Sequence, residues 1–212
     1  PITIDTTAPD APVITTTTSL TNIATPTITG TAEAGSTVEL FNGSESLGTV
    51  IAADNGTFLF DSYGELIDGS HQLTAISTDI AGNISFSSQG LSIIVDTTEP
   101  EKPIIATTTS LTNIATPTIT GTTAPGTTVT LLDGDNVLGS VIAGSDGSFS
   151  ITSSVLTDAD YTLTVTATDA AGNTSIPSAE LSITIDTTAP DAPVITTTTL
   201  SLIHISEPTR LV

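Results

Sequence analysis

Cysteine, methionine and tryptophan are absent from this sequence, and basic residues are nearly absent. Without cysteine no disulfide can support the fold, so each folded unit depends on packing or on a bound ion. Asp and Glu number 23 against 2 Lys and Arg, for a net charge of −21. Nucleic acid and anionic membranes bind basic surfaces, and no apolar run approaches the roughly 18 residues of a membrane span. We therefore expect no nucleic-acid partner and no membrane insertion.

Side chains that carry out catalysis are also scarce. The chain has two histidines, and no Ser-His-Asp set recurs along it. Acidic pairs are plentiful, but a glycosidase site needs a cleft for the sugar, usually with aromatic walls. Aromatic residues make up only 3% of the chain. We therefore expect no enzymatic activity.

The most informative feature that is present is an internal repeat. Residues 2–18 recur unchanged at 183–199, and a near-copy occupies 93–109, which gives a period of about 90 residues. Each period is long enough for one core of its own. We expect repeats at 5–95 and 96–185. Residues 1–4 would end a preceding repeat and 186–199 would begin a third, so we expect the chain to be an internal piece of a longer protein.

The third copy follows the first through Thr199 and then departs from it at once. Residues 200–212 read LSLIHISEPTRLV and include His204 and Arg210. This segment resembles the translated read-through of a sequencing adaptor, and the alternative is a genuine divergent C-terminus. We assign it no function.

Within a repeat, alternating apolar residues and closely spaced turn residues predict seven or so short strands and no helix. In the first repeat we place these strands at 12–17, 26–31, 37–41, 47–52, 57–60, 72–78 and 91–95. Val38 and Leu40 point to one face, as do Leu163, Val165 and Ala167 in the second repeat. The pattern is typical of a β-sandwich.

Two local features refine this fold. Asn42-Gly43 is predicted to supply the central residues of a type I′ hairpin turn, since both central residues need positive φ. Tyr161 opens the penultimate strand of the second repeat, where immunoglobulin-type sandwiches often have a tyrosine corner. His71 stands at this place in the first repeat. It is either a metal ligand or, as we expect, a partly exposed residue at the start of a strand.

Several motifs occur in the same order in both repeats. They include the Asp-Thr-Thr-x-Pro linkers, Leu-Gly-Thr/Ser-Val, and Thr-Asp-x-Ala-Gly-Asn at 78–83 and 168–173; the segment 30–38 and Asp-Gly-Ser-Phe at 146–149 are further marks. Over residues 1–199 the chain resembles the tandem bacterial Ig-like repeats of large surface adhesins and biofilm-associated proteins. The resemblance implies an elongated array of Ig-like sandwiches. It also implies a structural spacer or stalk, placed outside the cell or on the bacterial surface.

Acidic residues gather in the loops at one pole of each predicted sandwich. Because strands alternate in direction, the linker, the loop after the second strand, the turn near 55 and the loop at 79–83 should share this pole. In the second repeat these loops carry Asp96, Glu99, Glu101, Asp146, Asp169 and Asn173. In the first they carry Asp5, Asp10, Glu33, Asp54, Asp79 and Asn83. Glu65 and Asp68 are placed at the opposite pole, facing the second repeat.

Carboxylates held together repel one another unless a cation joins them, and calcium prefers oxygen ligands from such loops. The resemblance implies the same, because related repeats bind calcium near their junctions. We predict calcium at the joint, with Asp96 and Asp169 as the leading pair of ligands; a role for these Asp residues in local turns is the simpler alternative.

Three other interpretations stay open. The repeats could form a ligand-binding module for carbohydrate or a host protein, although the sequence lacks tryptophan. They could be accessory domains of a large secreted enzyme. The acidic surface could also be an adaptation to salt that needs no metal. On the spacer interpretation the partners are neighbouring repeats, and any host or surface ligand would bind through domains outside this sequence.

Overall fold

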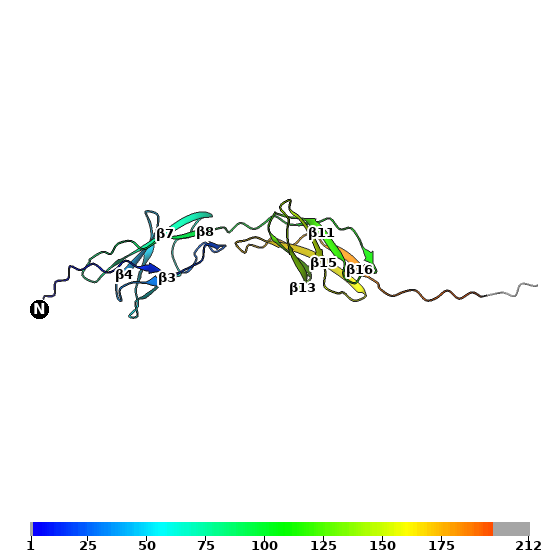
Figure 1. Cartoon of the computed structure of the whole chain (residues 1–212), viewed down its shortest axis with the longest axis horizontal. Coiled ribbons are helices and arrows are strands. Elements are labelled where there is room, and N and C mark those ends of the chain that lie inside the picture. The colour runs from blue at the N-terminus through cyan, green and yellow to red at the C-terminus, as the bar shows by residue number, and fades with distance from the viewer. Residues whose placement is uncertain (1, 197–212) are drawn as a thin grey trace, which may run out of the picture.

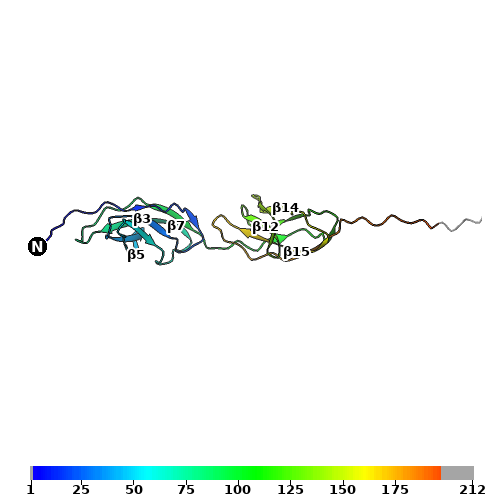
Figure 2. The same cartoon turned by 90° about the horizontal axis from the view of Figure 1, so that it is seen from below.

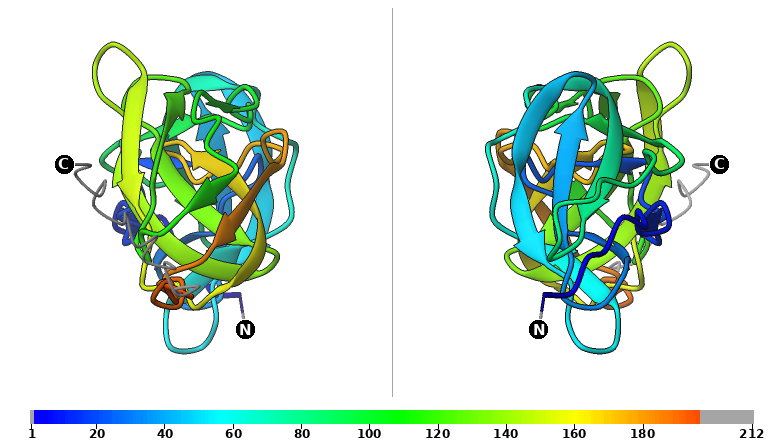
Figure 3. Two further views of the ribbon diagram at one scale, coloured as in Figure 1. Left: turned by 90° about the vertical axis from the view of Figure 1, so that its right-hand side faces the viewer. Right: turned by 90° about the vertical axis from the view of Figure 1, so that its left-hand side faces the viewer.

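The computed structural model describes residues 2–196, which form two β-sandwiches placed end to end (Figures 1 and 2). Every regular element in this range is a β-strand, and none of the described residues belongs to a helix that could cross a membrane. Figure 3 looks along the long axis, where one sandwich lies behind the other. The prediction of tandem all-β sandwiches is confirmed. The predictions for residue 1 and for 197–212, including the tail, lie outside the described residues.

Repeat 1 contains eight strands in two sheets. They are β1 (Val13–Ile14), β2 (Leu20–Thr21), β3 (Ile28–Thr31), β4 (Thr37–Asn42), β5 (Glu45–Ile51), β6 (Thr57–Phe60), β7 (Gly69–Thr78) and β8 (Leu91–Val95). One sheet has the order β1-β3-β6, and the other has the order β2-β8-β7-β4-β5. Strands β3 to β8 follow six of the predicted segments closely, β1 covers only part of the predicted strand 12–17, and β2 is additional.

Repeat 2 reproduces this arrangement strand for strand. Its strands are β9 (Ile104–Ile105), β10 (Leu111–Thr112), β11 (Thr118–Thr122), β12 (Thr128–Asp133), β13 (Asn136–Ile142), β14 (Ser148–Thr152), β15 (Ala159–Thr168) and β16 (Leu181–Ile185). The sheets are ordered β14-β11-β9 and β10-β16-β15-β12-β13. The equal topology means that a feature seen in one repeat can be checked in the other.

The first strand predicted at 12–17 is confirmed in place but is too long, because only Val13–Ile14 is a strand and the chain then changes sheets. β1 pairs antiparallel with β3, whereas β2 pairs parallel with β8 in the other sheet. The backbone ladder between β1 and β3 ends because a side chain replaces a backbone acceptor. Thr29 N–H donates to Thr16 Oγ1 at 2.8 Å. The backbone of the threonine-rich segment is then no longer paired with β3. The segment can therefore cross to the other sheet, where β2 pairs with β8.

The predicted type I′ turn is also wrong in its centre. Asn42 pairs with Glu45, so the two loop residues are Gly43 and Ser44. Gly43 has φ of 61°, and no residue other than glycine has positive φ in the described part of the chain. A positive φ at the first central position alone defines a type II′ turn, which glycine favours.

Each repeat has its own apolar core between its sheets. Ile28, Val38 and Leu40 are fully buried in repeat 1. Leu163 and Val165 are fully buried in repeat 2. Their outward neighbours on the same strands are exposed or half-buried, which is the period-two pattern predicted from the sequence. Because the two cores are separate, contact between the repeats is left to the linker and the loops at the poles.

Candidate functional site

The loops at the N-terminal pole of each repeat lie together, as the alternating strand directions predict. In repeat 1, Ala32 N–H donates to Gly56 O at 2.9 Å, which joins the loop after β3 to the turn before β6. A Cβ placed on Gly35 would lie 4.0 Å from Ile80 Cδ1, so the loop at 79–83 is adjacent. This pole therefore meets the incoming linker with several loops at once.

Asn173 holds the incoming linker against repeat 2. Its Nδ2 donates to Asp96 O at 2.7 Å and to Asp169 Oδ2 at 2.9 Å. Its backbone N–H donates to Asp169 Oδ1 at 2.9 Å, and the residue is only 7% exposed. The structure thus brings the predicted pair Asp96 and Asp169 together, through the asparagine that stands between them.

The same arrangement recurs at the start of repeat 1. Asn83 Nδ2 donates to Asp79 Oδ2 at 2.7 Å and to Asp5 O at 3.3 Å. In both linkers the aspartate side chain turns back on its own chain, since Thr7 N–H donates to Asp5 Oδ1 and Thr98 N–H to Asp96 Oδ1. These linker aspartates therefore contact the neighbouring loop through their backbone carbonyl oxygens, which accept from Asn83 and Asn173.

Asp68 of repeat 1 binds the linker between the two repeats, the one that Asn173 of repeat 2 also binds. Its Oδ1 accepts from Thr97 N at 2.9 Å and from Thr97 Oγ1 at 2.8 Å, and its Oδ2 accepts from Thr98 Oγ1 at 2.8 Å. The pole of Asp68 is the one predicted, but its role was missed. The available signal was the pair of threonines in each linker, which supply hydroxyl donors where the chain has few basic residues.

The remaining candidates occupy separate positions. Asp146 Oδ1 accepts from Ser148 N–H and Oγ within its own turn, at 3.0 and 2.7 Å. Asn55 does the same with Thr57 in repeat 1. The other predicted side chains are exposed to solvent: Asp10, Glu33, Asp54, Glu99 and Glu101. Across residues 2–196, no three Asp, Glu or His side chains gather closely enough to hold a metal ion.

The contacts at the joint show how calcium would have to be accommodated. Calcium takes six to eight oxygen ligands. Asp96 O and Asp169 Oδ2 both accept from the Asn173 side-chain amide, which already bridges them. Asp169 Oδ1 accepts from Gly172 N–H as well. The residues present satisfy one another with N–H donors and do not form a ready calcium cage, so calcium binding stays a prediction.

Hydrogen bonds hold the joint carboxylates in their charged form. The Thr97 backbone N–H, followed by the hydroxyls of Thr97 and Thr98, lowers the pKa of Asp68 below its ordinary value of 3.8. The Thr187 and Thr188 donors lower the pKa of Asp158 in the same way. The lowered pKa values mean that these contacts are formed by carboxylates and would weaken on protonation.

The residue near the start of the long strand is Tyr161 in repeat 2 and His71 in repeat 1, and both side chains bond to the preceding turn. Tyr161 OH donates to Thr157 O at 3.1 Å, so the predicted tyrosine corner is confirmed. His71 Nε2 bonds to Ile67 O at 2.8 Å, and its Nδ1 lies 3.0 Å from Asn42 Nδ2. His71 is half-buried near the start of β7, as expected. Both side chains reach back four residues and fix the turn before the long strand.

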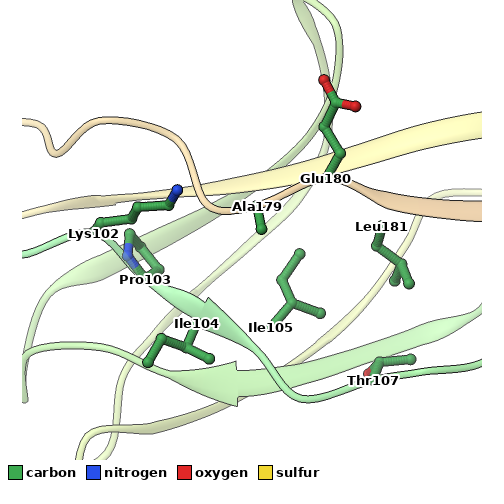
Figure 4. Close-up of a pocket in the computed structure, with 8 residues that line it drawn as sticks. All are labelled: Lys102, Pro103, Ile104, Ile105, Thr107, Ala179, Glu180 and Leu181. Atoms are coloured by element: carbon green, nitrogen blue, oxygen red, sulfur yellow. The ribbon is translucent and has the colours of Figure 1, made fainter.

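A pocket of about 380 Å³ lies on repeat 2 between Ile105 and Leu181, with Lys102 and Glu180 on its rim (Figure 4). The corresponding positions of repeat 1 carry Ala11 and Gly90 in place of the two charged residues. The charged rim is therefore particular to repeat 2, whereas the linker contacts recur in both repeats. We take the joint as the candidate functional site.

The chain belongs to the bacterial Ig-like domain family. The family model matches residues 1–97 and 105–187, which covers both sandwiches. Membership agrees with the two-sheet fold and with the motifs quoted from the sequence.

Similar proteins include one relative named as an exoglucanase and two solved structures. Exoglucanase B of Cellulomonas fimi is 32% identical over 193 residues, covering 86% of this chain and 17% of that protein. The fibronectin(III)-like modules of Clostridium thermocellum CbhA match 82% of this chain and 93% of theirs, at 19% identity and a TM-score of 0.55, which shows a shared fold. A biofilm-associated protein BSP domain matches 86% of this chain and 30% of its own, at 25% identity and a TM-score of 0.35.

The depressed carboxyl pKa values predict a stability that depends on pH. A group whose folded pKa is lowered contributes stability that is present above the unfolded pKa, here 3.8, and that is lost as the pH falls through the folded pKa. We expect the contribution of Asp68 and Asp158 to the free energy of unfolding to be constant above about pH 5 and to fall below it. Urea unfolding at stepped pH measures this. Asp68→Asn with Asp158→Asn should flatten the fall, and an unchanged profile would contradict the assignment.

Proposed function

We propose that these repeats are spacer modules of a larger extracellular protein, each fixing its neighbour at a defined joint. One observation carries the proposal: the two peptide groups of Asp96 are bonded to different repeats. Asp96 N–H donates to Thr21 O of repeat 1 at 2.9 Å, and Asp96 O accepts from Asn173 of repeat 2. A linker bonded on both sides transmits the direction of one sandwich to the next.

The first parent we propose is a bacterial surface adhesin, in which the repeats form the stalk. Units of one topology suit a stalk because length and direction matter there, and each unit can serve equally well. The partners of each repeat are then its neighbours in the chain, and an adhesive target binds through domains elsewhere in the protein. A stalk of this kind works outside the cell, on the bacterial surface.

A secreted enzyme is the second candidate parent, and a specific observation favours it. The relative from Cellulomonas fimi bears the name Exoglucanase B, and 86% of this chain aligns with it. The chain spans only about 17% of that protein's length, so the match concerns a minor part of the relative. Here the repeats would space a catalytic domain from other domains. Both parents give these residues the same mechanical role.

A binding module is supported less well by the geometry. A generic ligand site should recur in equal units, and the contacts that recur are those of the linker. The pocket beside Lys102 and Glu180 loses both charged residues in repeat 1. We therefore place the function in the joint.

The spacer proposal predicts that the chain is extended in solution. Because the linker is bonded to both sandwiches, small-angle scattering should give a largest dimension that fits two sandwiches end to end (Figure 1). The control is the same measurement at several protein concentrations, which separates chain length from association. A profile typical of two sandwiches folded back on each other, or of a freely swinging pair, would contradict the proposal.

Calcium at the joint is a separate prediction, supported by the net charge of −21 and by the meeting of Asp96 with Asp169. We expect calcium near 1 mM, within the range of extracellular calcium modules, to raise the melting temperature. Calorimetry in calcium, in magnesium, and in sodium chloride of matched ionic strength measures the effect. An equal rise in all three salts would contradict calcium binding and favour a general salt effect on an acidic surface.

A further inference from the structure

We propose that Asp68 is a linker clamp: its carboxylate fixes the direction in which the chain leaves repeat 1, and Asp158 does the same for the chain leaving repeat 2. The inference rests on the proposed spacer function and gives it a residue-level cause. It requires no cation, because the donors come from the linker threonines. The clamp therefore uses a side chain other than the predicted calcium ligands of the same joint, which come from the linker and from repeat 2.

The first support is the number of bonds that one carboxylate makes with two consecutive residues. Asp68 accepts one backbone and two hydroxyl hydrogen bonds from Thr97 and Thr98, all between 2.8 and 2.9 Å. Hydrogen bonds to a charged acceptor are roughly twice as strong as those between neutral groups. Thr97 and Thr98 are therefore held as a pair, and both oxygens of the carboxylate are engaged.

The second support is where these residues lie along the chain. β8 ends at Val95, and the next residue, Asp96, is already bonded through its carbonyl to Asn173 of repeat 2. Thr97 and Thr98 then return to Asp68 of repeat 1. Successive residues are thus bonded to repeat 1, repeat 2 and repeat 1 again, which leaves the backbone little freedom to turn. A Cβ on Gly172 would lie 3.6 Å from Asn22 Nδ2, so the two poles also approach one another here.

The third support is exact repetition at the following joint. Asp158 Oδ1 accepts from Thr187 N and Oγ1 at 2.9 and 2.7 Å, and Asp158 Oδ2 accepts from Thr188 Oγ1 at 2.8 Å. Asp186 N–H donates to Thr112 O at 3.0 Å, as Asp96 does to Thr21. The clamp on Thr187 and Thr188 is complete with repeat 2 alone. Each repeat therefore orients its outgoing linker before the next repeat is attached.

A purely local role for Asp68 makes a different prediction. If Asp68 only finishes the end of repeat 1, its loss lowers the stability of that repeat and leaves the angle between the repeats unchanged. If Asp68 is a clamp, its loss widens the range of angles between the two repeats. The distance between the two repeats, measured across the joint, separates the two roles.

The experiment uses the full chain with spin labels on Ser44→Cys and Asp135→Cys. The sequence has no native cysteine, and both positions are exposed in equivalent hairpins. Electron–electron double resonance in chelator should give a narrow distance distribution for this chain. Asp68→Ala should broaden it about twofold, because the released linker regains backbone freedom. Asp158→Ala is the matched control: it removes the same bonds at the next joint, so the measured distribution should stay narrow.

Two further variants guard against loss of folding. Thr97→Val with Thr98→Val leaves Asp68 in place, removes both hydroxyl donors and should broaden the distribution in the same direction. Asp68→Asn keeps one oxygen acceptor and should give an intermediate width. A narrow distribution in both Asp68→Ala and the double threonine variant would overturn the clamp while leaving the spacer function intact. A broad distribution in the unsubstituted chain in chelator would also overturn a clamp that needs no cation. A distribution that stays broad in about 1 mM calcium would overturn the spacer function itself.

Discussion

The structure depends on how its linker backbone is satisfied by hydrogen bonds. A segment between two domains normally leaves its N–H and C=O groups to water, and the domains then move independently. Here Asp96 bonds through N–H to one repeat and through C=O to the other, and Thr97 and Thr98 bond back to Asp68. The linker thus behaves as part of both sandwiches, and an array of two separate cores can hold one direction.

The amino-acid composition explains why neutral hydrogen-bond donors hold the linker. With 2 basic residues against 23 acidic ones, the chain cannot neutralise its carboxylates with Lys or Arg. Threonine hydroxyls, asparagine amides and backbone N–H groups supply the donors instead, as around Asp68 and Asp169. Such bonds are short and directional, so they specify geometry at an exposed joint. Calcium, if it binds, would add to a joint whose polar groups are already paired.

Much of the fold could be predicted from the sequence, because burial alternates strictly along strands such as β7 and β15. Pairing Asp96 with Asp169 and Asn173 followed from strand direction alone. The crossing after β1 was missed because Thr16 replaces a backbone partner with its side chain. The clamp was missed for a similar reason. Asp68 and Thr97 are 29 residues apart, and hydroxyl donors have no period by which a sequence pattern could reveal them.

Amide hydrogen exchange of the linker, read residue by residue, tests the central claim most directly. The N–H groups of Asp96 and Thr97 report the bonds to repeat 1, and the Asn173 side-chain amide reports the bond to repeat 2. If the linker is bonded to both repeats, all three exchange much more slowly than in an unstructured peptide. The two backbone N–H groups should approach the protection of the neighbouring β8 residues Ile94 and Val95. Exchange of Asp96 and Thr97 at the rate of a free peptide, beside a protected β8, would contradict the account.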